Sequence, residues 1–464
     1  MKFKRMMHLF YKFSFQDNKN NIILQKNKNM ATITIKNVGP IKSVENLEIN
    51  KVNVFMGQQS SGKSTIAKII SFCTWVEKRR MLDGFFRENF LECLKTFHNF
   101  EDTYFPSNAF FRYEGKYCNL EFSKMNKPNG EVFIKENIML FENRKNIFIP
   151  AERNFVASIP NLGRYKETNN NVMNFLYDWY EAKKHYQKNN MLNIPELDIS
   201  YYHIENEDRD KVIFCKEKEI ILRNASSGIQ SMLPLYLLMD YMTNGLFKNE
   251  TVLSPFEKEQ LKELAKPMME AELEKITETQ LEAEYHEIKE RIETGCKIEG
   301  DEFYLDIANY LKERKNDELL NFIINKMIIS RKYHFSQFII EEPEQNLFPS
   351  TQRDLVYHFL KLVTGKRDHR LTITTHSPYI LYALNNCMMG KLIFDKMDEE
   401  DRDAIVCKSS LINPKDVSIY QIEDGILKNI QQEDGLIVSN FFDEKMKEIM
   451  DDFYILLKYY DDEK

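Results

Sequence analysis

The chain has 464 residues, enough for one large α/β domain with insertions or for two to three ordinary domains. Hydrophobic residues make up 43% of it, including 33 Phe and 23 Tyr, so disordered, collagen-like and linker-rich classes are excluded. Its net charge of −7 gives no support to a polyanion-binding role, although a local basic groove remains compatible with an acidic total.

The seven cysteines are widely spaced and form no CxxC pair, which argues against a disulfide framework or a zinc site and indicates a reducing compartment. No apolar run reaches the ~18–20 residues of a membrane-spanning helix, so no membrane partner is expected. The first 30 residues are rich in Lys, Asn and Gln, and Met30 directly precedes the first strand pattern. We therefore expect a cytoplasmic protein in which residues 1–30 are a disordered extension, with the true start codon left open.

Alternating β-branched residues predict a first strand at 31–36, and further strands are expected at 47–49 and 52–56. The third strand runs directly into Gly57, and helical spacing continues from Ser64 to Phe72. A strand, a glycine-containing loop and a helix in this order are the setting of a phosphate-binding loop.

Later elements are a strand at 147–149, a hairpin of 211–215 with 219–222, an apolar helix at 231–244, and strands at 337–340 and 371–375. Residues 255–331 are dominated by charged residues, which predicts a solvated helical insertion, with a partner-binding coiled coil as the alternative. The expected organisation is a core of 31–254 and 332–415, carrying an inserted segment at 75–200. A C-terminal segment, 416–464, adds a strand and an acidic helix.

The loop 57–64 reads GQQSSGKS. Its two glycines allow a tight turn whose N–H groups face one point, and the following helix adds the positive end of its dipole there. A Lys at position 63 can reach the β- and γ-phosphates of ATP, and the Ser64 hydroxyl can bind Mg²⁺. The alternative is a glycine-serine turn without a ligand. The predicted ATP-binding residues are Gly57, Gln58, Gln59, Ser60, Ser61, Gly62, Lys63, Ser64 and Thr65.

Two later strands also end in polar residues. Residues 338–340 lead into Glu341 and Glu342, and 371–375 lead into His376. Strand ends in α/β proteins meet at the ligand-binding edge of the sheet, where one carboxylate can hold Mg²⁺ and the other can orient the attacking water. An acidic turn and a structural histidine are the alternatives. We predict that Glu342, His376 and Lys63 are catalytic, and that Ser64 and Glu341 bind the metal.

The segment 224–230, NASSGIQ, precedes an apolar helix and on its own predicts no more than a helix cap. Along the chain, the phosphate loop is followed by this segment, then by the double carboxylate and then by the strand-end histidine. This order of motifs resembles that of the ATP-binding-cassette (ABC) ATPases. Within them it resembles the SMC and RecF heads of chromosome maintenance and recombination repair. This resemblance implies an α/β P-loop NTPase of the ABC-ATPase head type, with a mixed sheet and helical insertions. It also implies that two copies sandwich ATP, with a signature motif acting in trans that consists of Ser226, Ser227, Gly228 and Gln230.

The sequences 149–153 (IPAER), 341–349 (EEPEQNLFP) and 375–378 (THSP) are similar to bacterial AAA-family ATPases related to the overcoming-lysogenization-defect (OLD) family. Many of these act in antiphage defence, which implies a sensor or regulatory subunit that controls a separate effector, a nuclease or toxin; the ATPase subunit of the PARIS system is similar in size. A DNA-repair or chromosome-associated ATPase that binds DNA is the alternative, and a transporter cassette is a third, weaker one.

Three features of these families are not recognisable in the sequence. The Asp-x-Asp of a C-terminal nuclease has the right letters at 401–403, but no apolar strand leads into them, so we expect a solvated loop. No glutamine lid motif stands between the phosphate loop and the signature segment; Glu152 and Arg153 lie in that region without an assigned role. No aromatic residue is assigned to adenine.

Overall fold

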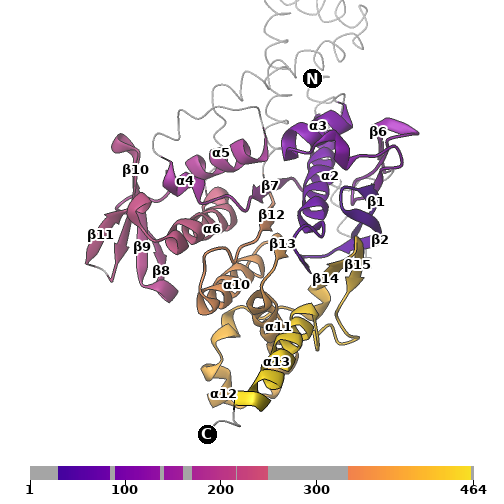
Figure 1. Cartoon of the computed structure of the whole chain (residues 1–464). Coiled ribbons are helices and arrows are strands. Elements are labelled where there is room, and N and C mark those ends of the chain that lie inside the picture. The colour runs from indigo at the N-terminus through magenta and orange to yellow at the C-terminus, as the bar shows by residue number, and fades with distance from the viewer. Residues whose placement is uncertain are drawn as a thin grey trace, which may run out of the picture. The chain divides into compact units, whose positions relative to one another are not determined.

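The computed structural model describes residues 30–83, 89–135, 141–159, 170–215, 217–248 and 333–460 (Figure 1). Residues 1–29 of the expected extension and the charged insertion 255–331 lie outside these ranges, as do parts of the inserted segment 75–200.

A mixed sheet of eleven strands organises the described residues, in the order β6-β5-β4-β1-β2-β15-β14-β3-β13-β12-β7. Five strands are mutually parallel: β14 (Val417–Glu423), β3 (Val52–Gly57), β13 (Arg370–Thr375), β12 (Phe335–Glu341) and β7 (Arg144–Ile149). The antiparallel half comprises β1 (Ala31–Val38), β2 (Ile41–Ile49), β4 (Phe110–Glu114), β5 (Cys118–Ser123) and β6 (Lys127–Ile134). The short β15 (Ile426–Asn429) joins the two halves through β14 and β2.

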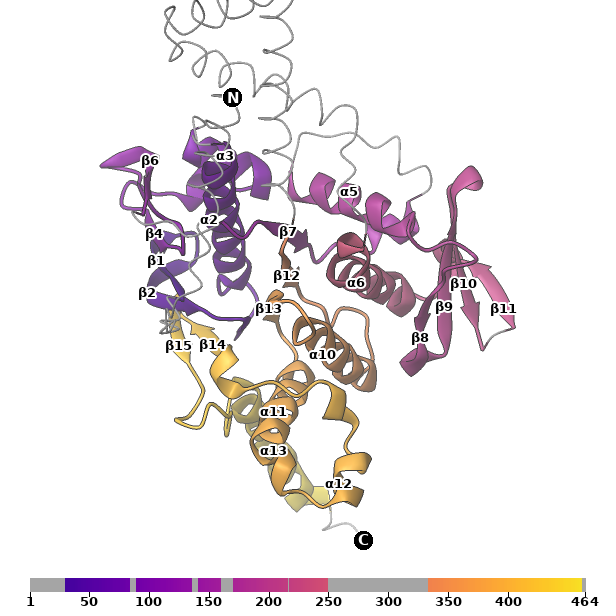
Figure 2. The same ribbon diagram turned by 180° about the vertical axis from the view of Figure 1, so that it is seen from behind.

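Helices cover both faces of the parallel half, so its strands are buried along almost their whole length. On β3, Val54 and Met56 face one core and Phe55 faces the other. The Phe55 side is covered by α2 (Lys63–Asp83) and α3 (Phe90–His98). The opposite side is covered by α5 (Asn171–Lys183), α6 (Ser227–Thr243), α10 (Pro349–Val363) and α11 (Pro378–Ile393) (Figure 2).

A second sheet, in the order β11-β10-β9-β8, extends the layer formed by α5 and α6. Its strands are β8 (Leu192–Ile194), β9 (Ile199–Ile204), β10 (Arg209–Phe214) and β11 (Lys218–Ile221). β10 and β11 form the hairpin expected from the sequence. Trp179 of α5 is buried against Tyr201 of β9, which joins this sheet to the core.

The remaining helices are short or lie near the C-terminus. They are α4 (Phe155–Ser158), α12 (Glu399–Ala404) and α13 (Phe441–Tyr460). Single 3₁₀ turns are η1 (Asp102–Tyr104), η3 (Pro195–Leu197), η4 (Glu205–Glu207), η5 (Leu222–Asn224), η6 (Gly245–Phe247), η7 (Phe394–Lys396), η8 (Val406–Ser409) and η9 (Pro414–Asp416). None of the described helices combines the length and apolar composition that crossing a bilayer requires.

The structure confirms the expected strands in β1, β3, β7, β12 and β13 and differs from the sequence analysis at two places. β14 lies beside β3, so the core sheet continues past residue 415 to Asn429. Residues 401–403 form part of the exposed helix α12 and not a loop, because the surrounding acidic and basic residues can remain solvated in a helix. No described strand leads into them.

Candidate nucleotide-binding site

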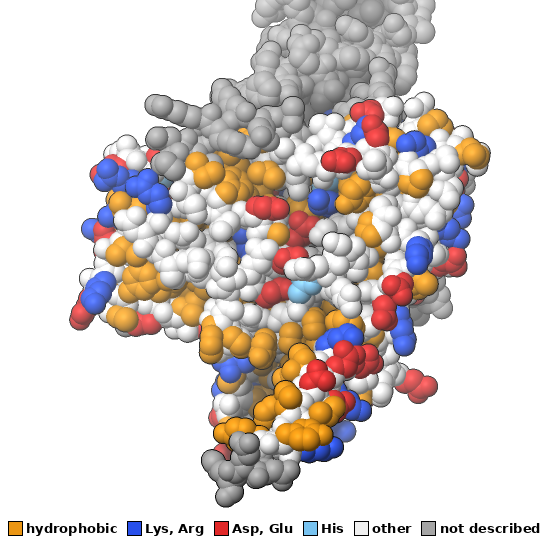
Figure 3. All heavy atoms as spheres, viewed as in Figure 1, with side chains coloured by type: hydrophobic (Ala, Val, Ile, Leu, Met, Phe, Trp, Pro, Cys, Tyr) orange, Lys and Arg blue, Asp and Glu red, His pale blue; other side chains and the backbone are white. Residues whose placement is uncertain are grey.

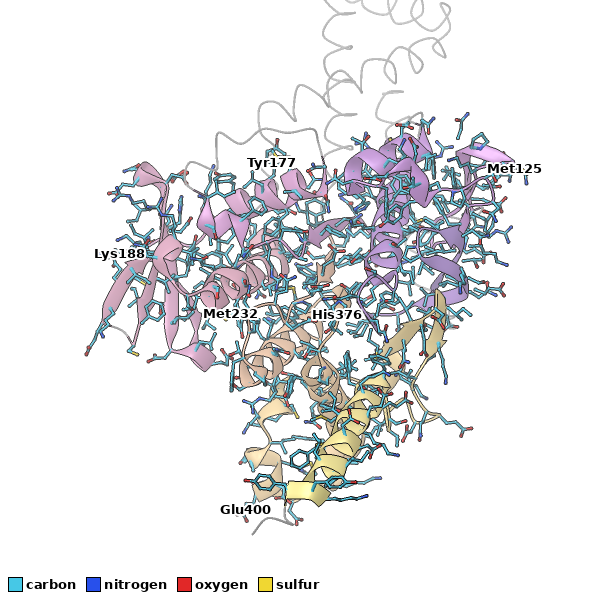
Figure 4. The ribbon with its side chains drawn as sticks, in the orientation of Figure 1. Met125, Tyr177, Lys188, Met232, His376 and Glu400 are labelled. Carbon is cyan, nitrogen blue, oxygen red and sulfur yellow. The ribbon has the colours of Figure 1, made fainter. Side chains whose placement is uncertain are left out.

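The predicted site residues converge because the parallel strands β3, β13, β12 and β7 are neighbours and end at one edge of the sheet. Thr375 pairs with Met56, and Glu341 pairs with Thr374, so Gly57, His376 and Glu342 follow strand ends at the same level. Figure 3 shows a histidine among acidic side chains at the centre of this face, and Figure 4 labels His376 there. Three motifs separated by up to about three hundred residues thus form one site.

The loop between β3 and α2 requires its two glycines. Gly57 has φ 154° and Gly62 has φ 105°, both in the range that favours glycine. A Cβ at Gly57 would lie 2.5 Å from the Ile422 carbonyl oxygen, and one at Gly62 would lie 2.3 Å from Ile41 Cδ1. The loop is therefore packed against β14 and β2 as well as preceding α2.

The Lys63 side chain is buried and folded back over its own loop. Its Nζ donates to the carbonyl oxygens of Gly57 (3.0 Å) and Gln58 (2.7 Å) and lies 3.5 Å from His376 Nδ1. Burial lowers the pKa of Lys63 to about 8, and the charges of Glu342 and Glu344 act in the opposite direction. The ammonium is thus partly desolvated and close to its deprotonation point.

His376 bridges Lys63 and Glu342. Its Nε2 lies 3.0 Å from Glu342 Oε1. A protonated lysine can only donate, so Nδ1 must accept from Lys63, and the ring proton then belongs on Nε2, which donates to the carboxylate.

The Glu342 carboxylate is held at both oxygens. Gln345 Nε2 donates to its Oε2 at 2.8 Å, while its backbone, at φ 42°, is fixed by an N–H bond to the Thr374 carbonyl oxygen. The hydrogen bond from His376 is the main cause that lowers the pKa of Glu342 to about 2. This carboxylate therefore stays ionised throughout the neutral range.

Glu341 fits a magnesium ligand by its burial and its unsatisfied oxygen. Its side chain is buried, its Oε1 has no hydrogen-bond partner among the described residues, and the Ser64 hydroxyl contacts the carboxylate. Burial raises the pKa of Glu341, and the charge of Lys68 opposes that shift. Within the described ranges, no three His, Cys, Asp or Glu side chains form a metal cluster. Mg²⁺ sites commonly use one or two protein groups together with substrate phosphates, and Ser64 and Glu341 offer two such oxygen ligands.

Arg153, to which the sequence assigned no role, clamps the backbone of the site. Its buried guanidinium donates to the carbonyl oxygens of Glu341 (2.9 Å), Glu342 (2.9 Å), Pro343 (3.2 Å) and, in α6, Ser231 (3.0 Å). Burial lowers the pKa of Arg153 to about 10, and the nearby glutamates oppose that shift. The end of β12 and the first turns of α6 are therefore joined through one side chain.

Glu344 is a second residue that the sequence analysis missed as part of the site. Its Oε1 accepts from Thr375 Oγ1 at 2.9 Å and from the His376 N–H at 2.5 Å, which fixes the backbone that carries the histidine. Burial raises the pKa of Glu344. The signal was present in the sequence as a third carboxylate two residues after Glu342, but its role depends on a neighbouring strand.

The segment 226–230 opens α6. Ser226 and Ser227 are exposed in the single chain, and the Ser226 side chain makes no cap hydrogen bond. Gln230 is turned inward instead: its Nε2 donates to the Arg223 and Ala225 carbonyl oxygens. Its side chain thus holds the preceding turn, and the trans role expected for this residue stays a prediction.

A loop after the double carboxylate packs against this helix start. Asn346 Nδ2 donates to Ser231 Oγ at 2.9 Å, and a Cβ on Gly228 would lie 3.0 Å from the Asn346 carbonyl oxygen. Together with Arg153, Asn346 links the loop that follows β12 to the start of α6.

Comparison with known proteins gives one family match. The family model described as an AAA domain (AAA_23) matches residues 32–326. Among curated proteins the sequence finds no match.

Solved structures give fold-level likenesses. The chain is similar to the SMC head domain from Thermotoga maritima, at 8% identity and a TM-score of 0.35, covering 87% of this chain and 99% of that one. It is also similar to an SmcHead bound to the C-winged helix domain of ScpA, at 9% identity and TM-score 0.33, covering 86% and 96%. A third is the recombination mediator protein RecF-ATPrS in the RecFOR pathway, at 10% identity and TM-score 0.27, covering 86% and 98%. These identities and TM-scores are too low to establish the fold class. The α/β P-loop NTPase class is confirmed instead by the chain's own strand order, its phosphate loop and the family match.

Replacing Arg153 with Lys tests the clamp. Lysine keeps the charge but cannot reach carbonyl groups on two elements, and each lost charge-assisted bond is worth roughly 1.5–3 kcal/mol. We expect kcat for ATP to fall at least about tenfold with KM nearly unchanged, measured by steady-state phosphate release. Arg223→Lys, on an exposed arginine that precedes the same helix, is the matched control. Equal losses in kcat and in ATP affinity would instead indicate general damage to the site.

The lowered pKa of Lys63 predicts that ATP binding is coupled to protonation of this amine. Near pH 7 the amine is mostly protonated, whereas at pH 9, above its pKa of about 8, it is mostly neutral. Phosphates favour the charged form, so ATP binding should take up close to one proton at pH 9 and almost none at pH 7. Calorimetry in buffers of different ionisation enthalpy measures this uptake. Lys63→Arg keeps its proton at both pH values and should show none; persistent uptake would assign the proton to another group.

Proposed function

The chain belongs to the AAA domain family, and we propose that it is an ABC-type ATPase that binds and hydrolyses Mg²⁺-ATP and works as a nucleotide-driven switch. The observation that carries this proposal is the chain of contacts from Lys63 through His376 to Glu342, at the edge of the sheet where the phosphate loop opens α2. It joins a phosphate-binding cation, a polar relay and an ionised carboxylate.

Each group has a task that follows from its surroundings. The loop glycines and Lys63 bind the phosphates, and Glu342, ionised because of His376, orients and polarises the attacking water. With a proton on Nδ1, His376 can exchange its contact with Lys63 for a donated hydrogen bond to the γ-phosphate. Ser64 and Glu341 would hold Mg²⁺, which neutralises charge on the phosphates. Arg153 and Glu344 keep Glu342 and His376 in place.

A second copy of the chain completes the proposed site. Ser227 and the start of α6 are exposed and offer N–H groups and hydroxyls suited to a phosphate held by another molecule's Lys63. Because Arg153 and Asn346 join this helix start to the catalytic loop, docking at α6 can bias the position of Glu342. Hydrolysis would then release the interface.

We further propose a cytoplasmic role as the sensor or regulatory subunit of an antiphage defence system. It would control a separate nuclease or toxin, as in ATPases related to the OLD family and in the PARIS system. The motifs at 149–153, 341–349 and 375–378 support this role. The alternative is a DNA-repair or chromosome-associated ATPase that binds DNA, and the acidic total of −7 counts mildly against it.

Replacing Glu342 with Gln should separate binding from hydrolysis. The amide keeps the shape of the side chain but cannot polarise water as a carboxylate does, so we expect kcat to fall by on the order of 10²–10⁴-fold while ATP still binds. Single-turnover hydrolysis and equilibrium ATP binding measure the two effects. Glu400→Gln, on the exposed helix α12, is the control. Full turnover in Glu342→Gln would refute the catalytic assignment.

The same variant tests the sandwich. With ATP, Glu342→Gln should gain an additional ATP-dependent contact between copies, seen as an assembly larger than the nucleotide-free form, and adding Ser227→Arg should abolish that ATP-dependent step while each chain still binds ATP. Loss of ATP binding in the isolated double variant would place Ser227 in the chain's own site.

The two biological roles predict different companions. Affinity purification of the native complex, with and without phage infection, should recover a nuclease or toxin under at least one condition. Binding to a fluorescent DNA duplex should not depend on ATP. ATP-dependent DNA binding without any protein companion would favour the repair alternative.

A further inference from the structure

Helix α13, Phe441–Tyr460, leaves its apolar residues uncovered. None of its side chains is buried, and every residue from 451 to 460 is exposed. Figure 3 shows hydrophobic side chains spread over this helix, which Figure 1 locates beside α11. The exposed apolar residues are Met446, Ile449, Phe453, Tyr454, Ile455, Leu456, Leu457, Tyr459 and Tyr460.

The base of the helix is nevertheless fixed. Phe441 and Phe442 pack against the core, and Asp443 accepts hydrogen bonds from the Asn440 N–H (2.9 Å) and from the hydroxyl of Tyr382 in α11. α13 is therefore held in a defined direction by its first turn, and its apolar surface is presented on a rigid element.

Six of the apolar residues follow a heptad spacing. Phe442, Met446, Ile449, Phe453, Leu456 and Tyr460 are separated by four, three, four, three and four residues. This alternation places one apolar seam along a helix that pairs with another helix of the same period, as in a coiled coil. A flat sheet edge or an irregular groove would not require this period. We name these six residues the α13 seam.

The exposed apolar area is large enough for a stable contact. Five seam residues, from 51% exposed at Phe453 to 69% at Leu456 and Tyr460, leave on the order of 700 Å² uncovered, against roughly 300–600 Å² for the largest patch of a typical monomer. A standard interface buries about 800 Å² on each partner. The patch can therefore supply most of one side of a dimer interface.

Charge argues against a membrane as the occupant. Helices that lie on bilayers carry a Lys- and Arg-rich polar face. The polar positions of α13 hold five acidic and three basic residues: Asp443, Glu444, Glu448, Asp451 and Asp452, with Lys445, Lys447 and Lys458. An anionic lipid surface would repel this face.

We propose that the α13 seams of two copies of this chain pair with each other. Every copy carries the same seam with the same spacing, which meets the requirement of a two-fold contact that one patch contacts its own equivalent. This contact is separate from the ATP sandwich: it needs no nucleotide and keeps two chains together after hydrolysis.

The test uses the full chain carrying Lys63→Ala, so that a dimer cannot arise from bound ATP. In nucleotide-free buffer, sedimentation equilibrium should show a reversible dimer or a larger even-numbered assembly. The double substitution Ile449→Glu with Leu456→Glu places two carboxylates in the seam and should raise the Kd for dimer dissociation at least about 100-fold. Both positions are exposed in the single chain, so folding should be unchanged by circular dichroism and thermal melting.

Lys447→Glu with Lys458→Glu is the matched control, because it adds carboxylates to the same helix outside the seam and should leave Kd within about threefold. A monomer in the Lys63→Ala chain, or an assembly that the seam variant does not weaken, would overturn the proposal. Seam-dependent flotation with anionic phosphatidylserine vesicles would overturn it as well, because the surface would then be a membrane contact. None of these results depends on whether the chain hydrolyses ATP.

Discussion

The candidate site depends on one constraint, that β3, β13, β12 and β7 run parallel and adjacent and so deliver their carboxyl ends to one edge of the sheet. Gly57, His376 and Glu342 come from different parts of the chain, and only this strand order places them within hydrogen-bond reach. The constraint is enforced by burial: β3, β12 and β7 contribute apolar side chains to helix-covered cores on both faces and β13 to one of them, so a one-residue shift in register would exchange the side chains that fill these cores.

Within that frame the polar groups are tied to one another more than to solvent. Lys63 contacts two carbonyl groups and His376, and the two oxygens of Glu342 contact His376 and Gln345. Such a network holds a carboxylate ionised and a lysine partly desolvated at the same edge. The partly desolvated lysine favours binding of a negatively charged phosphate chain, whereas the ionised carboxylate repels phosphates and suits the proposed role of orienting water.

Arg153 connects this network to helix α6, whose first residues lie at the surface. A single buried guanidinium contacts the carbonyl groups of Glu341 and Glu342 at one end and that of Ser231 at the other. A shift of α6 would therefore break bonds that fix the catalytic loop, which gives a physical route from a contact between copies to the position of Glu342. The apolar seam of α13 lies on a different element, so the two proposed contacts between copies would use separate surfaces.

The sequence by itself determined the phosphate loop and the strand-end residues, because their chemistry is local. A buried strand, two glycines and a helix specify the loop at 57–64, and apolar strands that end in Glu341, Glu342 and His376 identify the rest. Tertiary structure alone decided what Arg153 does, since its partners are backbone carbonyl groups 78 to 190 residues away, and a carbonyl leaves no mark in the sequence. It also decided that β14 joins the core sheet beside β3, because parallel pairing between distant strands has no turn signal of its own. The exposure of α13 could not be predicted for a related reason. A heptad pattern shows which residues share one apolar face of a helix, and only the packed fold shows that the described part of the chain leaves that face uncovered.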